Sequence, residues 1–360
     1  MTSPERTERL GLPGVLTAAE AAATAAAIAS VQRTDGAIPW FRGHHLDPWD
    51  HVEAAMALDI AGEHERAAAA YDWLARNQNP DGSWYAAYAD GDPGRPTDLG
   101  KESNFCAYPA VGVLHHYLAT GDELFRRRMW PVVASATEFV LGLQQDGGQL
   151  GWRRDPDGTP VPDALLTGSA SCYQALRCAL ALAELERAPQ PDWELAAGRL
   201  GHAVRRHPER FLDKSEYSMD WYYPVLAGAV RGPAATARLA QRWDEFVVPD
   251  LGVRCVLSRP WVTGGESAEL ALALWTAGDP DRAVDILRWI GHLRAEGGMY
   301  WTGYVYPDDA LWPGELTTWT AGAVLLAVAA LTGHEPTQAV FAGDRLPRGL
   351  DPDCCRVARG

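Results

Sequence analysis

A short motif returns four times along this 360-residue chain and limits its possible folds more than any other feature. Each copy places a glycine turn after an apolar stretch, with an aromatic residue soon after the turn. The copies are VQRTDGAIPWF (31–41), RNQNPDGSWY (76–85), LQQDGGQLGW (143–152) and LRAEGGMYW (293–301). Segments near 207–222 and 250–263 keep a loop and a tryptophan without the Gln-Asp-Gly. Because such turns end helices, the motif predicts repeated helical units.

Alanine and leucine at helical spacing fill the intervals between the turns. They predict twelve helices, at residues 17–33, 49–62, 64–78, 103–119, 122–144, 164–187, 192–207, 218–231, 234–248, 265–277, 279–295 and 315–332. Glycine followed by an acidic residue in the tight links 61–65, 120–124 and 277–281 joins helices as hairpins. No segment shows strand alternation. Six hairpins predict an all-α fold, a closed (α/α)6 toroid in which inner and outer helices alternate.

An open solenoid is the alternative architecture, but solenoids need atypical capping repeats and neither end of this chain has one. We expect one domain over residues 1–360, with 1–14 and 340–360 as peripheral tails. The N-terminus lacks an apolar signal core and no run of about eighteen apolar residues occurs. The sequence therefore predicts a cytoplasmic protein without stable membrane insertion. The net charge of −15 disfavours nucleic acid as a partner.

The Q-x-x-D-G-x-W pattern of residues 78–84 resembles the QW repeat of squalene–hopene cyclases and protein prenyltransferases, which are α/α toroids. Residues 117–148 and 153–185 are similar to the middle hairpins of six-hairpin glycoside hydrolases, which share that toroid. Both resemblances imply the same fold. The first implies isoprenoid chemistry, and the second implies carbohydrate chemistry.

Carboxylates stand at the predicted start of every inner helix. They are Asp50, Glu53, Glu102, Asp163, Asp220, Glu266 and Glu315. Parallel inner helices would bring these acids to one mouth, although acids at helix N-termini also stabilise a helix by about 0.3–1 kcal/mol each. Aromatic and polar residues expected to contact substrate there are Trp49, Asp50, His51, Trp84, Trp152, Tyr173, Trp221, Trp261, Trp301, Asp308, Asp309, Trp312 and Trp319. Carboxylates interleaved with aromatic rings suit a neutral polyol.

Other chemistries lack their motifs. The D-x-D-D of terpenoid cyclases and the D-D-x-x-D that holds magnesium diphosphate are absent, Asp308-Asp309 being the nearest string. No Cys and His stand together at inner-helix starts, and no G-x-S-x-G or phosphate loop occurs. We therefore expect neither a metal nor a cofactor.

These observations favour an inverting glycoside hydrolase with paired carboxylates, acting on a carbohydrate or glycoconjugate, whether a small molecule, an oligosaccharide or a lipid-linked substrate. By position, the resemblance to six-hairpin glycosidases implies Asp163 as acid and Glu315 as base, about 6.5–9.5 Å apart. Glu102, Asp220 and Glu266 are further catalytic candidates. Two alternatives stay open, an isoprenoid-processing enzyme and a non-catalytic ligand-binding toroid.

Overall fold

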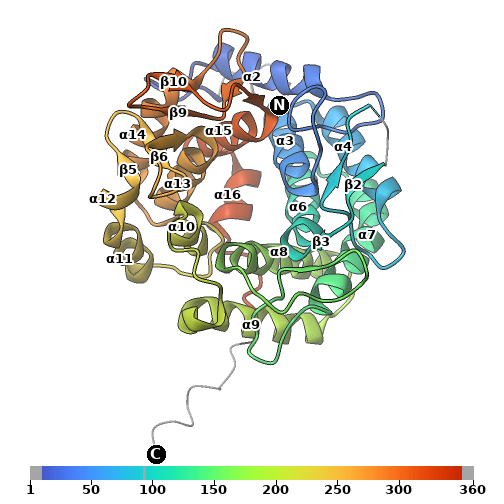
Figure 1. Cartoon of the computed structure of the whole chain (residues 1–360). Helices are drawn as coiled ribbons and strands as arrows, with labels where there is room; N and C mark the ends of the chain where they lie inside the picture. Colours follow the sequence, from blue (N-terminus) through green and yellow to red (C-terminus); the bar gives the residue numbers. More distant parts are fainter. Residues whose placement is uncertain (1–9, 92–94, 351–360) are drawn as a thin grey trace, which may run out of the picture.

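A closed ring of helices forms the protein (Figure 1). The computed structural model describes residues 10–91 and 95–350. Within them the inner ring consists of α3 (Pro48–Ile60), α6 (Pro109–Thr120), α8 (Leu166–Leu185), α10 (Ser218–Leu226), α13 (Gly264–Thr276) and α15 (Thr318–Leu331). Each of these helices packs on the next, and α15 packs on α3. The predicted toroid is confirmed.

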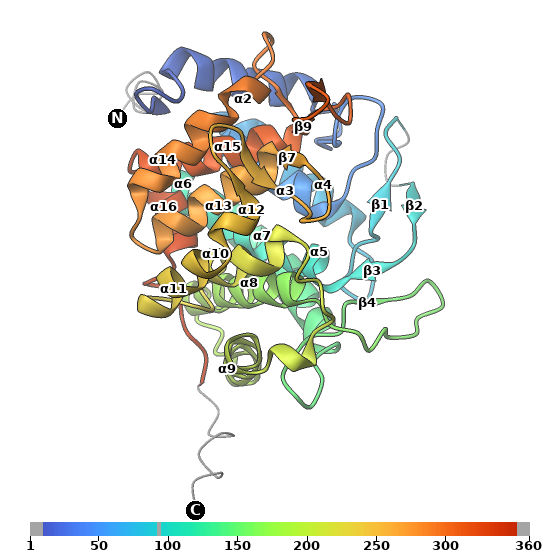
Figure 2. The same ribbon diagram turned by 60° about the vertical axis from the view of Figure 1, so that its left-hand side comes forward.

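A second layer of helices surrounds this ring. It contains α2 (Ala18–Val31), α4 (His64–Asn77), α7 (Glu123–Leu141), α9 (Pro191–Arg206), α11 (Pro233–Gln241) and α14 (Pro280–Trp289). Five of these described outer helices follow their inner partner along the chain. The sixth, α2, precedes the others and packs on α15, so the first helix of the described residues closes the ring against a helix near the end of the chain (Figure 2).

The recurring motif braces neighbouring repeats. Gly82 has φ +87°, and a β-carbon there would lie 2.1 Å from the carbonyl oxygen of Ser135 on α7. Gln78 Nε2 donates to the carbonyl of Gly82, at 2.9 Å, and to that of Val132 on α7, at 2.8 Å. Gln32 makes the equivalent pair of hydrogen bonds, to the carbonyls of Gly36 and Arg66. Gln144 does the same with the carbonyls of Gly148 and Ala196. The turn is therefore a scaffold element.

Several predicted helices are shorter or divided in the structure. The predicted helix 103–119 breaks at Tyr108 into α5 (Ser103–Ala107) and α6, because Pro109 begins a new helix. The predicted helix 218–231 ends at Leu226. Segment 234–248 divides into α11 and α12 (Trp243–Phe246), and segment 279–295 ends in a 3₁₀ turn (Ile290–Leu293).

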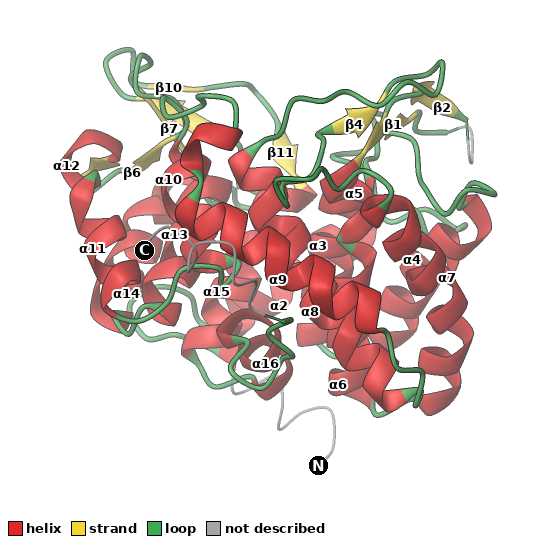
Figure 3. Ribbon diagram, turned by 90° about the horizontal axis from the view of Figure 1, so that it is seen from below, coloured by secondary structure: helices red, strands yellow, loops and turns green. Residues whose placement is uncertain are grey.

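The expectation that no strands form is wrong. Short antiparallel strands gather at one end of the molecule (Figure 3). In the described chain, one sheet has the order β10-β9-β7-β6-β5. Its strands are β5 (Val247–Val248), β6 (Gly252–Arg254), β7 (Trp261–Thr263), β9 (Gly303–Val305) and β10 (Ala310–Leu311). The pairs are β1 (Ala87–Tyr88) with β2 (Pro96–Asp98), β3 (Lys101–Glu102) with β4 (Arg153–Arg154), and β8 (Tyr300–Trp301) with β11 (Leu316–Thr317). Strands of two or three residues are too short to show alternation.

A further helix, α16 (Glu335–Ala342), lies outside the predicted set. It packs on α6 and α15 at the end of the ring opposite the strands (Figure 3). Val340, Phe341 and Leu346 are buried, so this part of the expected tail 340–360 belongs to the core. Residues 1–9 and 351–360 of the expected tails lie outside the described residues. Among the described helices, none has both the length and the apolar character needed to cross a bilayer.

Candidate active site

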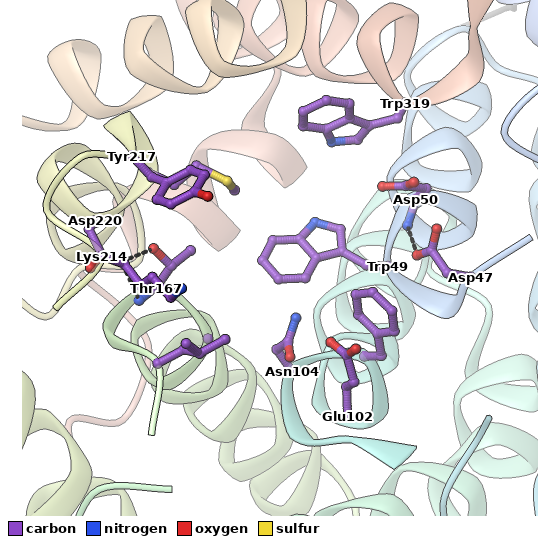
Figure 4. A pocket seen from close by; sticks show the side chains of 14 residues that line it. Asp47, Trp49, Asp50, Glu102, Asn104, Thr167, Lys214, Tyr217, Asp220 and Trp319 are labelled. Carbon is purple, nitrogen blue, oxygen red and sulfur yellow. Dashed lines mark hydrogen bonds between the residues drawn. The ribbon is translucent and has the colours of Figure 1, made fainter. Parts of the chain in front are cut away.

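A cavity of about 370 Å³ opens at the end of the ring where the inner helices begin (Figure 4). Its walls come from the first turns of four inner helices, from the β3–α5 segment and from the loop before α10. The lining residues are Asp47, Trp49, Asp50, Glu102, Asn104, Phe105, Leu165, Thr167, Gly168, Lys214, Tyr217, Met219, Asp220 and Trp319. Carboxylates and tryptophans thus share one cavity.

Asp47 and Asp50 stand together at the start of α3. Asp47 is the N-cap of this helix, and its Oδ1 accepts a hydrogen bond from the backbone N–H of Asp50 at 3.0 Å. Pro48 occupies the first helical position, where its missing N–H costs nothing. Burial raises the pKa of Asp50 well above its ordinary value, and the negative charge of Asp47 raises it further. Asp50 therefore holds a proton at pH values where an exposed aspartate is ionised.

Glu53 lies one turn deeper on α3 and supports an aromatic wall of the cavity. Its Oε1 accepts hydrogen bonds from Trp49 Nε1 at 3.0 Å and from Tyr108 Oη at 2.9 Å. Trp49 also stacks on Tyr108, with ring centroids 5.0 Å apart. Burial raises the pKa of Glu53 to about 7, although the two hydrogen bonds oppose this shift. Farther in, burial and the charge of Glu53 raise the pKa of Glu269, which accepts a hydrogen bond from Tyr222.

Asp220 occupies the wall that faces Asp47 and Asp50 (Figure 4). Its Oδ1 accepts hydrogen bonds from Thr167 Oγ1 at 2.6 Å and from the Thr167 backbone N–H at 3.3 Å. Burial raises the pKa of Asp220, while the bonds from Thr167 lower it. The side chain comes from α10, which stands across the ring from α3. Two acidic walls are thus separated by the open cavity.

Trp319 forms a second aromatic surface at the mouth. Its ring stacks on Trp40, with centroids 5.7 Å apart, and a β-carbon on Gly265 would lie 2.4 Å from it. Glycine at position 265 is therefore required for this placement of the ring. Trp40 Nε1 in turn donates to Glu315 Oε2 at 3.1 Å. Glu315 therefore holds Trp40, the ring on which the lining residue Trp319 stacks.

The carboxylates predicted as the acid–base pair do not meet in this cavity. Asp163 is exposed in the loop before α8, and its backbone carbonyl accepts the N–H of Trp152. Glu315 contacts Trp40 and does not line the cavity. Their assignment as acid and base is based only on their positions in the sequence relative to six-hairpin glycosidases. In this chain the loops place both side chains outside the cavity lining.

The cavity brings together five of the predicted site residues: Trp49, Asp50, Glu102, Asp220 and Trp319. The other predicted residues that do not line it are His51, Trp84, Trp152, Tyr173, Trp221, Trp261, Glu266, Trp301, Asp308, Asp309 and Trp312. Three of them are scaffold residues. Trp84 is fully buried and donates to the Leu74 carbonyl at 2.9 Å, and both ring nitrogens of buried His51 bond to backbone groups. Trp221 is buried and stacks on Phe246.

Further predicted residues lie outside the cavity lining, although Trp152 contacts one of the lining residues. Trp261 Nε1 donates to the carbonyl of Trp312 at 2.7 Å, beside the larger sheet. Asp308 and Asp309 are exposed in the β9–β10 turn, and Trp301 is in β8. The Trp152 side chain hydrogen-bonds Glu102 and opposes the rise in pKa that burial gives that carboxyl. Glu266 is buried near the start of α13, and its Oε2 has no hydrogen-bond partner within the described residues.

Sequence reasoning missed several residues of the cavity. They are Asp47, Asn104, Phe105, Leu165, Thr167, Gly168, Lys214, Tyr217 and Met219. An aspartate directly before a helix-starting proline is an N-cap signal, and this pattern in residues 46–50 could have identified Asp47. No comparable signal marks Lys214 or Tyr217, which lie in an irregular loop. Across the described chain, no three His, Cys, Asp or Glu side chains are arranged to hold a metal ion.

Comparison with known proteins gives one curated relative of high identity. No family model matches the chain. The chain is 54% identical over 341 residues to the MMP endo-(1,4)-3-O-methyl-α-D-mannosidase of Mycolicibacterium hassiacum. The matched region covers 95% of this chain and 94% of that protein.

Solved structures with the same fold are also similar. A glycosidase in complex with glucose matches with a TM-score of 0.71 and 18% identity, over 92% of this chain and 99% of that one. A GH63 mannosylglycerate hydrolase from Thermus thermophilus matches with a TM-score of 0.64 and 15% identity, over 84% and 98%. At such identities these two matches establish the fold. With the relative above, they support the six-hairpin glycosidase resemblance: the chain belongs to the family of the MMP endo-(1,4)-3-O-methyl-α-D-mannosidase and is a carbohydrate-acting glycoside hydrolase.

Proposed function

We propose that this protein is an inverting endo-hydrolase of (1,4)-linked 3-O-methyl-α-D-mannose chains, the specificity in the name of its relative. The observation that carries the proposal is the position of Asp50 at the cavity wall, with a raised pKa. Burial and the negative charge of Asp47 both raise the pKa of this carboxyl well above its ordinary value. A general acid must keep its proton near neutral pH until the glycosidic oxygen takes it.

Asp50 acts as this acid and protonates the leaving oxygen. Asp47 lies beside it and favours its protonated form, since two adjacent carboxylates do not readily ionise together. The Asp47 cap also fixes the position of Asp50 on the first turn of α3. The acid therefore needs no movement of the backbone to reach a sugar that rests on Trp49.

Asp220 acts as the general base and activates a water molecule on the opposite face of the sugar. An inverting mechanism needs a second carboxylate across the cavity, about 6.5–9.5 Å from the acid, with room for one water. Asp220 lines the facing wall, and the two bonds from Thr167 fix its Oδ1. Glu266 is the alternative base, because it also stands at the start of an inner helix.

The lining of the cavity suits a methylated sugar. Trp49 and Trp319 offer flat surfaces for the apolar face of a pyranose. Phe105, Leu165 and Met219 add apolar surface that favours an O-methyl group over a hydroxyl. A neighbouring cavity of about 320 Å³ shares Lys214 and Asp220 with this one, which provides space for further sugars of a longer chain.

The acid assignment is tested with Asp50→Asn. We expect a loss of about 10²–10⁴-fold in kcat on a (1,4)-linked 3-O-methyl-α-mannan oligosaccharide, with substrate binding retained. Asp163→Asn and Glu315→Gln serve as matched controls and should keep most of the activity. Turnover unchanged in Asp50→Asn would refute the assignment. Proton NMR of the fresh reducing end should show the β-anomer first, and an initial α-anomer would contradict inversion.

The base assignment is tested by azide rescue, in which a small anion replaces the activated water. Asp220→Asn should lose activity and regain part of it in sodium azide, whereas Asp50→Asn should not. Rescue confined to Glu266→Gln would move the base to Glu266. An unmethylated (1,4)-linked α-mannan oligosaccharide, run in parallel, should be cleaved with lower kcat/KM if the apolar wall selects the methyl group.

A further inference from the structure

A second, larger cavity lies at the end of the ring opposite the candidate active site. Its volume is about 750 Å³. The residues around it are Tyr173, Arg177, Gly198, Arg205, Gly228, Ala229, Arg231, Gly232, Trp275, Thr276, Gly278, Ala342, Gly343, Asp344, Arg348 and Gly349. They come from the inner helices α8 and α13, the outer helix α9, the loop between α10 and α11, and the end of α16 with the segment that follows it, away from the strand-bearing loops (Figure 3). No lining residue is shared with the cavity that holds Asp50.

This cavity is strongly basic, although the whole chain carries a net charge of −15. Arg177, Arg205, Arg231 and Arg348 line it, against Asp344 as the acidic lining residue. Arginine guanidinium groups match the planar geometry of phosphate and carboxylate. Their concentration in a hollow of an acidic protein attracts small anions to that place.

Two of these guanidinium groups converge on one point. A β-carbon placed on Gly343 would lie 3.0 Å from Arg177 Nη1 and 3.1 Å from Arg231 Nη2. Within the described chain, neither arginine has a carboxylate at ion-pair distance. Burial lowers the pKa of both groups, and the charge of Arg177 lowers that of Arg231 further. The negative charge of Asp344 raises the pKa of both arginines but lies beyond ion-pair distance, so the repulsion between the two like charges is only partly offset.

A purely structural role explains only part of this arrangement. Arg177 Nε and Nη2 donate to the carbonyls of Pro347 and Leu346, at 2.8 and 3.0 Å, and Nη2 also donates to the carbonyl of Gly343, so Arg177 holds the segment after α16. Arg231 Nη2 donates to the Phe341 carbonyl at 3.2 Å. Carbonyl oxygens satisfy donors but do not neutralise charge. Among the described residues, Arg177 Nη1 and the Nε and Nη1 of Arg231 have no acceptor.

Aromatic side chains complete the walls. Tyr173 is only 4% exposed, and the Arg177 guanidinium stands over its ring at 5.5 Å. Trp275 lines another part of the cavity and is half-buried. Trp275 is thus the aromatic side chain of this cavity with exposed surface, and such a surface near cationic groups suits an anion that also carries a ring, because the ring can stack while the charge is paired.

We propose that this cavity is a second binding site, which takes a small molecule bearing a phosphate or carboxylate group between Arg177 and Arg231. The remaining volume and the Trp275 side chain accommodate a sugar-sized body. The site is separate from hydrolysis and stands whether or not Asp50 is the catalytic acid.

The test measures binding of inorganic phosphate, citrate and mannose 6-phosphate by calorimetry, with sodium chloride at matched ionic strength as the control. Binding to this cavity is distinguished from binding to the active site by the arginine variants described below. We expect saturable binding with a raised Tm, tightest for mannose 6-phosphate if the aromatic walls contribute. The relative affinities of phosphate and citrate identify the preferred oxyanion.

The arginine variants decide the location. Arg231→Gln should raise the dissociation constant at least about tenfold, as expected when a charge-assisted hydrogen bond is lost. Arg127→Gln, an exposed arginine on α7 that pairs with Glu123, should bind like the natural protein. Arg348→Gln gives a second test if Arg231→Gln is unstable. The absence of saturable binding in the natural protein, or affinity unchanged in both cavity variants, would overturn the proposal.

Discussion

Three carboxylates follow one another at residues 47, 50 and 53, from the N-cap of α3 into its second turn. Their spacing of three residues keeps them near one face of the helix, which here points into the ring. The first caps the helix, the second lies at the cavity wall, and the third supports Trp49. Asp47 and Glu53 are only 5% and 3% exposed, whereas Asp50 between them is partly exposed at the cavity wall, so Asp50 is the acid of this set that a substrate can reach. Sequence reasoning marks Asp50 and Glu53 but misses Asp47, and it cannot tell which of the three faces the open cavity.

The raised pKa of Glu53 predicts how the free energy of unfolding depends on pH. Burial raises its pKa from 4.5 to about 7, so its neutral form favours the folded state. This contribution is complete below pH 4.5 and is lost as the pH rises through 7, with a size of about 3 kcal/mol. Glu53→Gln cannot titrate, and its unfolding free energy should therefore fall less between pH 5 and pH 8. Urea unfolding at both pH values measures the difference.

Glu123→Gln is the matched control for this experiment, because Glu123 is an exposed residue of α7. It should show the same pH dependence as the natural protein. A Glu53→Gln protein whose stability falls with pH as steeply as that of the natural protein would show that another group in the buried acidic set carries the titration.

At the scale of elements, the recurring turn acts through its backbone. Its glycine lets one loop approach the backbone of the next outer helix, and its glutamine bonds to both. The sequence predicts this scaffold role because Gln, Asp and Gly recur together. It could not predict α16, which is short and begins beyond the last predicted helix, nor the paired rim strands, whose partners are distant in the chain.

Gly82→Ala should be far more harmful than Gly62→Ala. Both glycines have positive φ, +87° and +84°, but only Gly82 has a carbonyl oxygen 2.1 Å from the new β-carbon. Left-handed strain alone should cost about 1–2 kcal/mol at Gly62. Strain and overlap together should cost about 3–5 kcal/mol at Gly82. Denaturant unfolding of the two variants measures this, and equal losses would mean that the turn does not brace α7.

The candidate site shows where sequence reasoning stops. Asp50, Glu102 and Asp220 can be identified because inner helices of a toroid share one mouth, a consequence of the fold alone. The choice of Asp163 and Glu315 depends on position in a loop, and loop conformation depends on contacts that local sequence does not encode. Trp84 illustrates the same limit, since a tryptophan after a turn can face the mouth or, as here, the core.

For the molecule as a whole, stability depends on closing the ring. Thr24 on α2 donates its buried Oγ1 to the carbonyl of Gly298 at 2.8 Å, which joins the first helix to the last copy of the turn. Thr24→Val keeps the shape but leaves that carbonyl unpaired, and it should cost about 1–3 kcal/mol. Calorimetry should show one transition at a lower Tm. Ser30→Ala, an exposed change in the same helix, should leave Tm unchanged, and an unaltered Tm in Thr24→Val would place closure elsewhere.

The position of α2 also determines when the protein can fold during its synthesis. The helix is made first, but its partner α15 leaves the ribosome almost three hundred residues later. At ordinary elongation rates this interval is on the order of tens of seconds. Throughout it, the apolar face of α2, which carries Ala21, Ala25 and Ile28, can pack on α3 but lacks the surface that α15 will provide. The ring of the growing chain therefore cannot close until α15 has been made, and until then its early helices expose apolar surface that favours aggregation.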